Sequence, residues 1–216
     1  MAETGLFITL EGGEGVGKTT GMEYLEHCLR EQGVDLVVTR EPGGTRFGER
    51  VRDLLLEVRQ ESMDDMAELL LIFAARAQHL REVIKPALGS GKWVLCDRFT
   101  DATYAYQCGG RRIDPAVVSR LETLVQDALR PNFTILFDAP VSVGMARAKD
   151  RGELDRFERE SSKFFAAVRQ NYLARAAQDA ERVRVIDASQ PLDAVKKSLK
   201  AVVMQIIEAA QSRGTL

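Results

Sequence analysis

The feature that most constrains this chain is a glycine-rich loop near its start, where residues 12–19 read Gly-Gly-Glu-Gly-Val-Gly-Lys-Thr. The loop fits the pattern G-x-x-x-x-G-K-[ST], and it follows an apolar run and precedes an amphipathic segment. Glycines let successive backbone N–H groups point at phosphate oxygens, and the next helix presents its partly positive N-terminus. In such loops the lysine bridges the β- and γ-phosphates, and the following hydroxyl coordinates Mg²⁺. We therefore expect a nucleoside triphosphate such as ATP to bind at Gly12, Gly13, Glu14, Gly15, Val16, Gly17, Lys18, Thr19 and Thr20.

The rest of the chain alternates short apolar runs with longer segments in which apolar residues recur every three or four positions. This alternation predicts an α/β protein with a mostly parallel sheet covered by helices on both faces. No repeat or linker divides the chain, so residues 1–216 are expected to form one domain. The expected strands are 6–10, 36–39, 93–96, 134–137 and 183–186, and the expected helices are 22–29, 69–88, 117–129, 164–177 and 195–207.

Charge and cysteine content exclude several classes of protein. Lysine and arginine number 30 against 32 aspartate and glutamate, so a net charge of −2 gives no basic field for a nucleic-acid polymer. Cys28, Cys96 and Cys108 form no C-x-x-C pair and have only His27 and His79 as companions, which argues against structural zinc. We find no signal peptide and no apolar stretch of about 18 residues. The sequence favours a reduced, cytoplasmic protein without a membrane partner.

Charged residues follow two of the expected strands. Asp97 and Arg98 come at the end of the third, at the carboxyl edge where open α/β sheets bind ligands. A carboxylate there can hold Mg²⁺ and a guanidinium can clamp a phosphate, whereas an ion pair closing the sheet edge is the alternative. Arg40 follows the second strand within Thr-Arg-Glu-Pro-Gly-Gly-Thr (39–45) and is a second candidate clamp, with an ordinary surface arginine as the alternative.

A nucleobase pocket is indicated by two aromatic segments. Phe73 and Arg76 share one face of the expected third helix, so the ring could stack on a base while the guanidinium hydrogen-bonds a base carbonyl. A core phenylalanine beside a snorkelling arginine explains the same pattern. In the glycine-rich turn expected at 104–111, Gln107 could read a base edge and Tyr106 could close against a sugar.

Four motifs, in order and spacing, resemble those of the bacterial thymidylate kinases, and the resemblance runs from about residue 5 to about residue 207. It implies a P-loop kinase fold with a five-stranded parallel sheet in strand order 2-3-1-4-5. It also implies phosphoryl transfer from Mg-ATP to dTMP without a covalent intermediate, a step in dTTP synthesis, by a homodimer packed through helices. The motifs are the phosphate loop, residues 39–45, Phe-Ala-Ala-Arg at 73–76, and Asp-Arg-Phe at 97–99 followed by Tyr-Gln at 106–107 and Gly-Arg at 110–111.

The resemblance also implies roles for single residues. Glu14 resembles the loop carboxylate that faces the sugar 3′-hydroxyl, Tyr106 the residue that crowds the 2′ position, and residues 187–190 the loop beside adenine. Arg40 and Arg98 resemble clamps on the dTMP phosphate. Phe73 resembles the ring that stacks on thymine and Arg76 the residue that reads its carbonyl, while Thr103 and Gln107 resemble residues that line the base edge. The dTMP set is Glu14, Arg40, Phe73, Arg76, Arg98, Thr103, Tyr106 and Gln107, and the metal set is Thr19 and Asp97. Many members have three glycines after the glutamine; here Cys108 takes the first place, where a side chain would restrict a glycine-only backbone angle.

The charged segment 147–156 is expected to be a short lid. Some thymidylate kinases carry an arginine immediately after the loop carboxylate, whereas this chain has Gly15 there. A mobile cation must then reach the transferring phosphoryl group from elsewhere. We expect Arg151 to supply it, with Arg147 as the second choice, so the catalytic set is Lys18, Arg98, Arg151 and Arg147. A solvated helix end is the alternative.

Two other functions share part of this pattern. A deoxynucleoside kinase has the same loop and an Asp-Arg pair but phosphorylates a nucleoside, and two candidate phosphate clamps argue against it. A nucleotide-binding regulatory protein that hydrolyses slowly would transfer phosphate to no added monophosphate.

Overall fold

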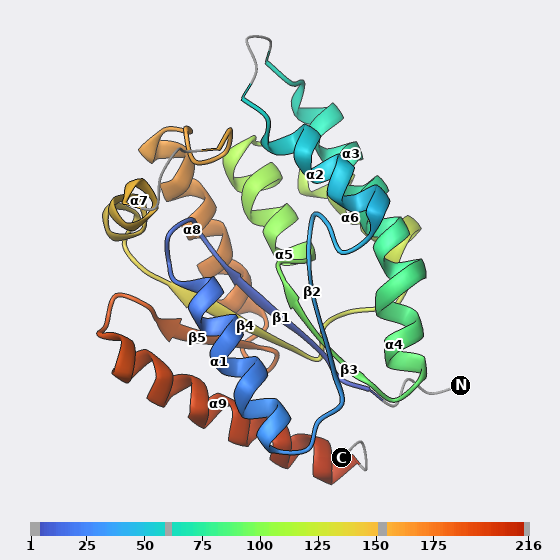
Figure 1. Cartoon of the computed structure of the whole chain (residues 1–216). Coiled ribbons are helices and arrows are strands. Elements are labelled where there is room, and N and C mark those ends of the chain that lie inside the picture. Colours follow the sequence, from blue (N-terminus) through green and yellow to red (C-terminus); the bar gives the residue numbers. More distant parts are fainter. Residues whose placement is uncertain (1–4, 59–61, 151–154, 214–216) are drawn as a thin grey trace.

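The computed structural model of the chain describes residues 5–58, 62–150 and 155–213. Within these ranges five parallel strands form one sheet in the order β2-β3-β1-β4-β5 (Figure 1). This confirms the α/β class, the five expected strands and the strand order implied by the resemblance. The strands are β1 (Phe7–Gly12), β2 (Leu36–Arg40), β3 (Trp93–Asp97), β4 (Phe133–Asp138) and β5 (Val183–Asp187).

Helices connect the strands, and polar residues cap several of them. Thr45, Asp64 and Ser161 each accept a hydrogen bond from the first turn of the helix that follows. None of the described helices contains a stretch long and apolar enough to cross a bilayer. The helices are α1 (Lys18–Glu31), α2 (Arg46–Leu56), α3 (Asp65–His79), α4 (Lys85–Gly89), α5 (Thr100–Thr103), α6 (Pro115–Gln126), α7 (Val141–Lys149), α8 (Ser162–Gln178) and α9 (Leu192–Arg213), with π-helical stretches η1 (Leu80–Ile84) and η2 (Tyr104–Gly110).

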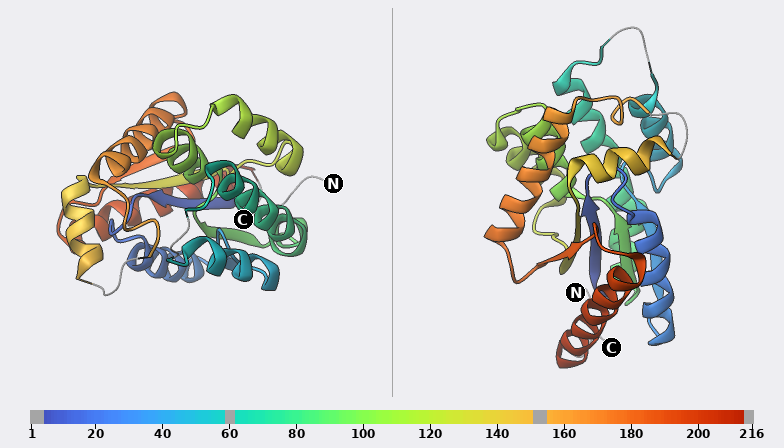
Figure 2. Two further views of the ribbon diagram at one scale, coloured as in Figure 1. Left: turned by 90° about the horizontal axis from the view of Figure 1, so that it is seen from above. Right: turned by 90° about the vertical axis from the view of Figure 1, so that its left-hand side faces the viewer.

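Alternate residues of β1 face opposite sides of the sheet, as the two-residue period of a strand requires. Ile8 and Leu10 belong to the apolar cluster that α1 and α9 form on one face, and Phe7 packs with η1 and α4 on the other. Figure 2 shows helices on both sides of the sheet. On the second face β1 also carries Thr9 and Glu11, both fully buried. The core beneath the phosphate loop therefore contains a polar layer.

The helices differ from the sequence-based expectation in several places. Helices α2, α5 and α7 were not among those expected. The helix expected at 117–129 ends at Gln126, because Asp127 has a positive φ of 55°. The turn expected at 104–111 is instead helical as far as Gly110.

The backbone at Cys108 corrects a further expectation. Cys108 lies within η2 and has no positive φ, so the idea that a side chain there restricts a glycine-only angle is wrong. The two glycines that follow serve close packing instead. A Cβ on Gly110 would lie 2.3 Å from the Phe164 ring, and one on Gly109 would lie 2.9 Å from the carbonyl oxygen of Ala167. Their absence of side chains lets η2 pack closely on α8.

All five strands are parallel, so their carboxyl ends meet at one edge of the sheet. In the register of the sheet Asp97 of β3 lies between Arg40 of β2 and Leu10 of β1. The phosphate loop leaves the sheet at Gly12, beside Phe137 of β4. Open α/β folds bind their ligands at this edge.

Candidate active site

The phosphate loop has the backbone that its glycines permit. Gly12, Gly15 and Gly17 have φ angles of 139°, 67° and 92°, in the region that side chains disfavour. Lys18 is the first residue of α1, and its Nζ donates hydrogen bonds to the carbonyl oxygens of Gly12 (3.1 Å) and Gly13 (2.7 Å). Burial and the nearby Arg98 guanidinium lower the pKa of the Lys18 ammonium to about 8. The loop thus holds a buried cation that a phosphate group would stabilise.

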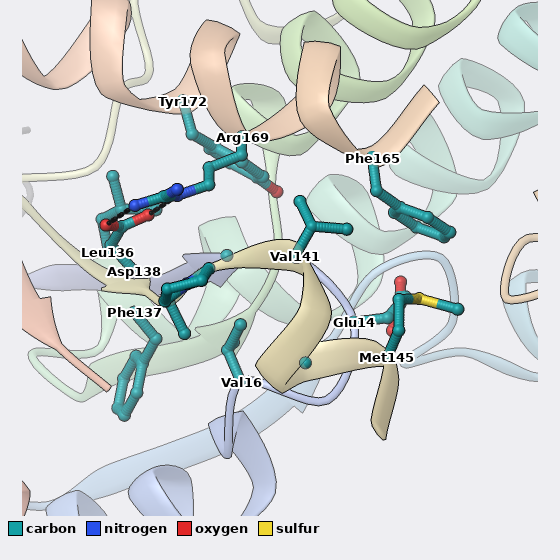
Figure 3. Close-up of a pocket in the computed structure, with 15 residues that line it drawn as sticks. Glu14, Val16, Leu136, Phe137, Asp138, Val141, Met145, Phe165, Arg169 and Tyr172 are labelled. Carbon is teal, nitrogen blue, oxygen red and sulfur yellow. Dashed lines mark hydrogen bonds and ion pairs between the residues drawn. The ribbon is translucent and has the colours of Figure 1, made fainter. Parts of the chain in front are cut away.

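Helix α7 packs so closely on the loop that Gly15 has no room for a side chain. A Cβ on Gly15 would lie 1.9 Å from the carbonyl oxygen of Gly144, and one on Gly144 would lie 2.3 Å from that of Glu14. A small pocket remains between the loop, α7 and α8 (Figure 3). On its far side Arg169 donates two hydrogen bonds, of 2.7 and 2.8 Å, to Asp138. The packing excludes an arginine at position 15, so the loop itself carries no cation there.

Asp97 and Thr19 are the residues expected to hold a metal ion. Asp97 ends β3, and its Oδ1 is buried without a hydrogen-bond partner among the described residues. A buried carboxylate oxygen without a partner costs free energy unless a cation or a donor occupies its free side. Thr19 is exposed in the first turn of α1. Magnesium takes few protein ligands and keeps water and phosphate oxygens, so this pair fits Mg²⁺. No group of three acidic, histidine or cysteine side chains suited to a metal occurs in the described part of the chain.

Arg98 joins the phosphate loop to the neighbouring cleft. Its Nη1 donates to the carbonyl oxygen of Gly12 at 2.9 Å, and its Nη2 donates to Glu14 Oε1 at 2.7 Å. Tyr106 Oη donates to the same carboxylate oxygen at 2.7 Å, and the Arg98 guanidinium lies over the Tyr106 ring. Arg98 also has a positive φ of 68°, a sparsely populated backbone for this residue that is typical of functional sites.

A buried carboxylate that sequence reasoning missed holds the backbone after Arg98. Glu11 Oε1 accepts a hydrogen bond from Phe99 N–H at 2.7 Å, and its Oε2 accepts one from Tyr172 Oη at 2.8 Å. Burial and the charge of Asp101 raise the pKa of Glu11 to about 7. No signal in the sequence distinguishes this glutamate from a surface one, because its role depends on α8 arriving from far along the chain.

The second cleft opens beside the loop, with which it shares Glu14. Its walls come from α2, α3, η2 and the segment that begins at Asp155. The residues lining it are Glu14, Glu41, Pro42, Arg52, Leu56, Ile72, Arg76, Arg98, Phe99, Ala102, Thr103, Tyr106, Gln107, Asp155 and Phe157.

Arg76 is held in this cleft by several partners. Its Nε donates to Glu41 Oε2 at 2.7 Å, and its Nη2 donates to Thr103 Oγ1 at 2.9 Å. The guanidinium also lies 4.8 Å from the centre of the Phe73 ring and 4.9 Å from that of Phe99. Arg76 is only 1% exposed. The structure therefore brings Arg76, Thr103, Tyr106 and Gln107 together as expected.

Two of the expected acceptor residues lie elsewhere. Phe73 packs against Leu69 and Val118 and does not line the cleft; Ile72, one position earlier, does. Arg40 is half exposed and donates to Glu49 Oε2 at 2.7 Å.

The cleft instead contains Arg52 of α2, which sequence reasoning missed. Its Nη1 donates to the carbonyl oxygen of Pro42 at 3.1 Å. Burial and the positive charges of Arg40 and Arg98 lower the pKa of Arg52. No signal in the sequence indicates that Arg52 lines the cleft, because the helix that carries it, α2, was not expected. The cleft thus has three lining arginines among the described residues, Arg52, Arg76 and Arg98.

The expected lid lies partly outside the described residues, and Arg151 is among those not described. Arg147 lies in the last turn of α7 and donates to the carbonyl oxygen of Ala188 at 2.9 Å. Ala188 belongs to the 187–190 loop, in which Asp187 accepts hydrogen bonds from Ser189 and Gln190. Those bonds lower the pKa of Asp187. Arg147 is thus associated with the loop expected beside adenine.

Comparison with known proteins identifies the relatives of this chain. The family model described as "Thymidylate kinase" matches residues 10–199. This chain belongs to the thymidylate kinase family. A thymidylate kinase of Pseudomonas entomophila (strain L48) is 59% identical over 205 residues, covering 95% of this chain and 98% of that protein. One of Ectopseudomonas mendocina (strain ymp) is 58% identical over 208 residues, covering 96% and 99%.

The fold agrees with that of a solved thymidylate kinase. The crystal structure of thymidylate kinase from Ehrlichia chaffeensis has a TM-score of 0.72 and 33% identity, and the match covers 92% of this chain and 98% of that one. Membership of the thymidylate kinase family makes this chain a kinase of nucleotide biosynthesis, with a nucleotide as phosphate donor.

Proposed function

We propose that the protein transfers the γ-phosphoryl group of Mg-ATP to dTMP, giving dTDP and ADP as a step in the cytoplasmic synthesis of dTTP. The observation that carries this proposal is the wall shared by the two halves of the site. Glu14 belongs to the phosphate loop and lines the cleft, and Arg98 is bonded to both the loop and Glu14. An acceptor in the cleft would therefore meet a donor in the loop at Arg98.

The proposed transfer needs no general base. A phosphate monoester has a second pKa of about 6, so the acceptor is mostly dianionic at neutral pH and its oxygen carries no proton to remove. That oxygen forms a bond to the γ-phosphorus in line with the leaving β–γ bridging oxygen, whose bond to phosphorus breaks. Catalysis then rests on positioning and charge neutralisation.

Cations of the loop and the cleft supply this neutralisation. Lys18, buried over the loop, would bridge the β- and γ-phosphates. Arg98 and Arg52 line the cleft and would hold the acceptor phosphate, with Arg40 as an outer clamp close enough to lower the pKa of Arg52. Arg151 of the lid is our candidate for a cation that approaches the transferring group, because the packing at Gly15 leaves no room for a cationic side chain in the loop.

Asp97 and Thr19 would hold Mg²⁺, since Asp97 Oδ1 is buried and lacks a partner among the described residues. The bound metal neutralises charge on the donor phosphates. The protein's own contribution is a fixed carboxylate at the end of β3, in register with Arg40 and next to Arg98.

We infer that the protein acts as a homodimer. Leu70 of α3 and Leu124 of α6 are 51% and 79% exposed, and these helices contact each other. Ala77, two turns after Leu70, lines a shallow hollow together with Leu124. Exposed apolar side chains grouped on two adjoining helices favour a protein partner. Leu124→Glu should give a monomer in sedimentation, whereas Leu192→Glu, at an exposed leucine of α9, should leave the dimer intact.

The decisive experiment is a coupled assay of ADP release with a panel of acceptors: dTMP, dUMP, dCMP, dAMP, thymidine and none. We expect the fastest release with dTMP and the appearance of dTDP on anion-exchange chromatography. Transfer to thymidine in preference to dTMP would show a nucleoside kinase. Slow release that no acceptor accelerates would show a regulatory nucleotide-binding protein.

A further inference from the structure

Glu68, a residue of α3 outside the proposed machinery, is fully buried and lies next to Gln107, which lines the acceptor cleft. Its Oε1 accepts a hydrogen bond of 2.8 Å from Gln107 Nε2. Arg111 donates to both of its oxygens at 3.2 Å, and Arg156 Nη2 donates to Oε2 at 2.6 Å. A carboxylate buried among two guanidinium groups is an acceptor only. The amide of Gln107 must therefore turn its amino group toward Glu68.

This orientation decides what Gln107 offers to a ligand. Gln107 lines the cleft, and its one side-chain hydrogen bond within the described residues is the bond to Glu68. With its amino group committed, the amide presents its carbonyl oxygen to the cleft as an acceptor. Arg76, which lines the same cleft, has donors only. Arg76 thus offers the cleft a donor group, and Gln107 offers it a fixed acceptor.

Pyrimidine bases differ at these two positions. Thymine and uracil have an O4 acceptor next to an N3–H donor, whereas cytosine has an N4 amino donor next to an unprotonated N3 acceptor. We propose that Glu68 is a specificity-determining positioning residue, which fixes the Gln107 amide so that the cleft accepts a base with N3–H and rejects cytosine. The proposal rests on the proposed function, because it assumes that the base enters this cleft.

The same carboxylate joins the residue proposed to recognise the base to Arg156, at the end of the segment expected to be the lid. Arg156, besides its bond to Glu68, donates through Nε to the carbonyl oxygen of Leu55 at 2.6 Å. Its guanidinium stacks over the ring of Phe157, which lines the cleft and meets Tyr106 edge to face. Glu68 therefore connects Gln107 to Arg156, the last residue of the segment expected to be the lid.

The isosteric variant Glu68→Gln tests the proposal. The new amide oxygen would stay with the two arginines, and its amino group would then face Gln107, whose amide would turn over and present its amino group to the cleft. We expect the preference for dTMP over 5-methyl-dCMP, measured as a ratio of kcat/KM values, to fall at least about tenfold, the effect of one hydrogen bond. The ratio for dTMP over dUMP should stay within about twofold, because these bases share O4 and N3–H.

Glu160→Gln is the matched control, because Glu160 pairs with Arg111 but does not contact Gln107. It should keep the wild-type preference. An equal loss with all three acceptors in Glu68→Gln, or an unchanged preference, would overturn the proposal. If circular dichroism shows that Glu68→Gln is unfolded, Glu68→Asp is measured in its place. This variant keeps a negative charge beside the two arginines but moves the carboxylate away from Gln107. An unchanged preference for dTMP over 5-methyl-dCMP in Glu68→Asp would also overturn the proposal. A wild-type enzyme that transfers to none of the three would instead refute the proposed function.

Discussion

The phosphate loop is made by one continuous stretch, residues 12–19, whereas the cleft beside it draws its walls from α2, α3, η2 and the segment beginning at Asp155. The loop is shaped by backbone angles and closed by one lysine. The cleft is shaped by bonds between side chains, such as Glu41 to Arg76. A change in the loop should therefore remove transfer from any acceptor, whereas a change in the cleft should alter which acceptor is used.

The largest effect is expected from Lys18→Ala. Removing a cation that neutralises the transferring phosphates should lower kcat on the order of a thousandfold, with little change in the affinity for dTMP. Steady-state kinetics with dTMP as acceptor measure this. Lys92→Ala, which removes a half-exposed lysine paired with Asp35, is the control and should behave as wild type. Turnover near normal in Lys18→Ala would mean that the loop does not carry the donor.

Arg151→Ala should lower kcat on the order of a hundredfold and change the KM for dTMP little, because a lid cation acts on the transition state. Arg147→Ala should act differently. Its partner is the carbonyl oxygen of Ala188, so its loss should chiefly raise the KM for ATP. A normal kcat in both variants would show that neither arginine of the lid acts on the transferring phosphoryl group.

Arg76→Ala probes the cleft alone. We expect the KM for dTMP to rise roughly ten- to a hundredfold, since a hydrogen bond to a charged donor is worth about 1.5–3 kcal/mol, and the KM for ATP to stay unchanged. Arg30→Ala, at an exposed arginine of α1 paired with Glu26, is the control. Equal rises in both KM values, or loss of the folded state by circular dichroism, would return Arg76 to a purely structural role.

The same contrast explains how far the sequence could be interpreted. The strands and the phosphate loop were predicted because their signals are local: apolar runs in one case and glycines at fixed spacing in the other. In the cleft, Arg76 was predicted because an arginine is unusual on an apolar helix face, whereas Thr103, Tyr106 and Gln107 were predicted chiefly from the resemblance to the family.

The residues that sequence reasoning missed depend on contacts between distant segments. Arg52 reaches the cleft from a helix without a strong local signal, and Glu68 differs from a surface glutamate only because Arg111 and Arg156 converge on it. Phe73 was placed on the cleft because it shares a helix face with Arg76. Successive side chains of a helix are rotated by about 100°, and in α3 this rotation places Ile72, rather than Phe73, among the residues that line the cleft.

A smaller effect is expected from pH, and it concerns the loop. Burial and Arg98 lower the pKa of Lys18 to about 8, so the free enzyme loses this charge as the pH rises through 8. The kcat/KM for ATP should therefore fall up to about tenfold per pH unit above pH 8, while kcat stays flatter because bound phosphates hold the proton. A kcat/KM that stays constant up to pH 9.5 would contradict the lowered pKa of Lys18.

Titration calorimetry of dTMP and of ATP into Lys18→Ala and Arg76→Ala tests the central claim most directly, that donor and acceptor have separate halves joined at Arg98. If the claim holds, Lys18→Ala binds dTMP like the wild type and ATP weakly, and Arg76→Ala shows the reverse. Loss of both ligands in both folded variants, or normal dTMP binding in Arg76→Ala, would contradict it.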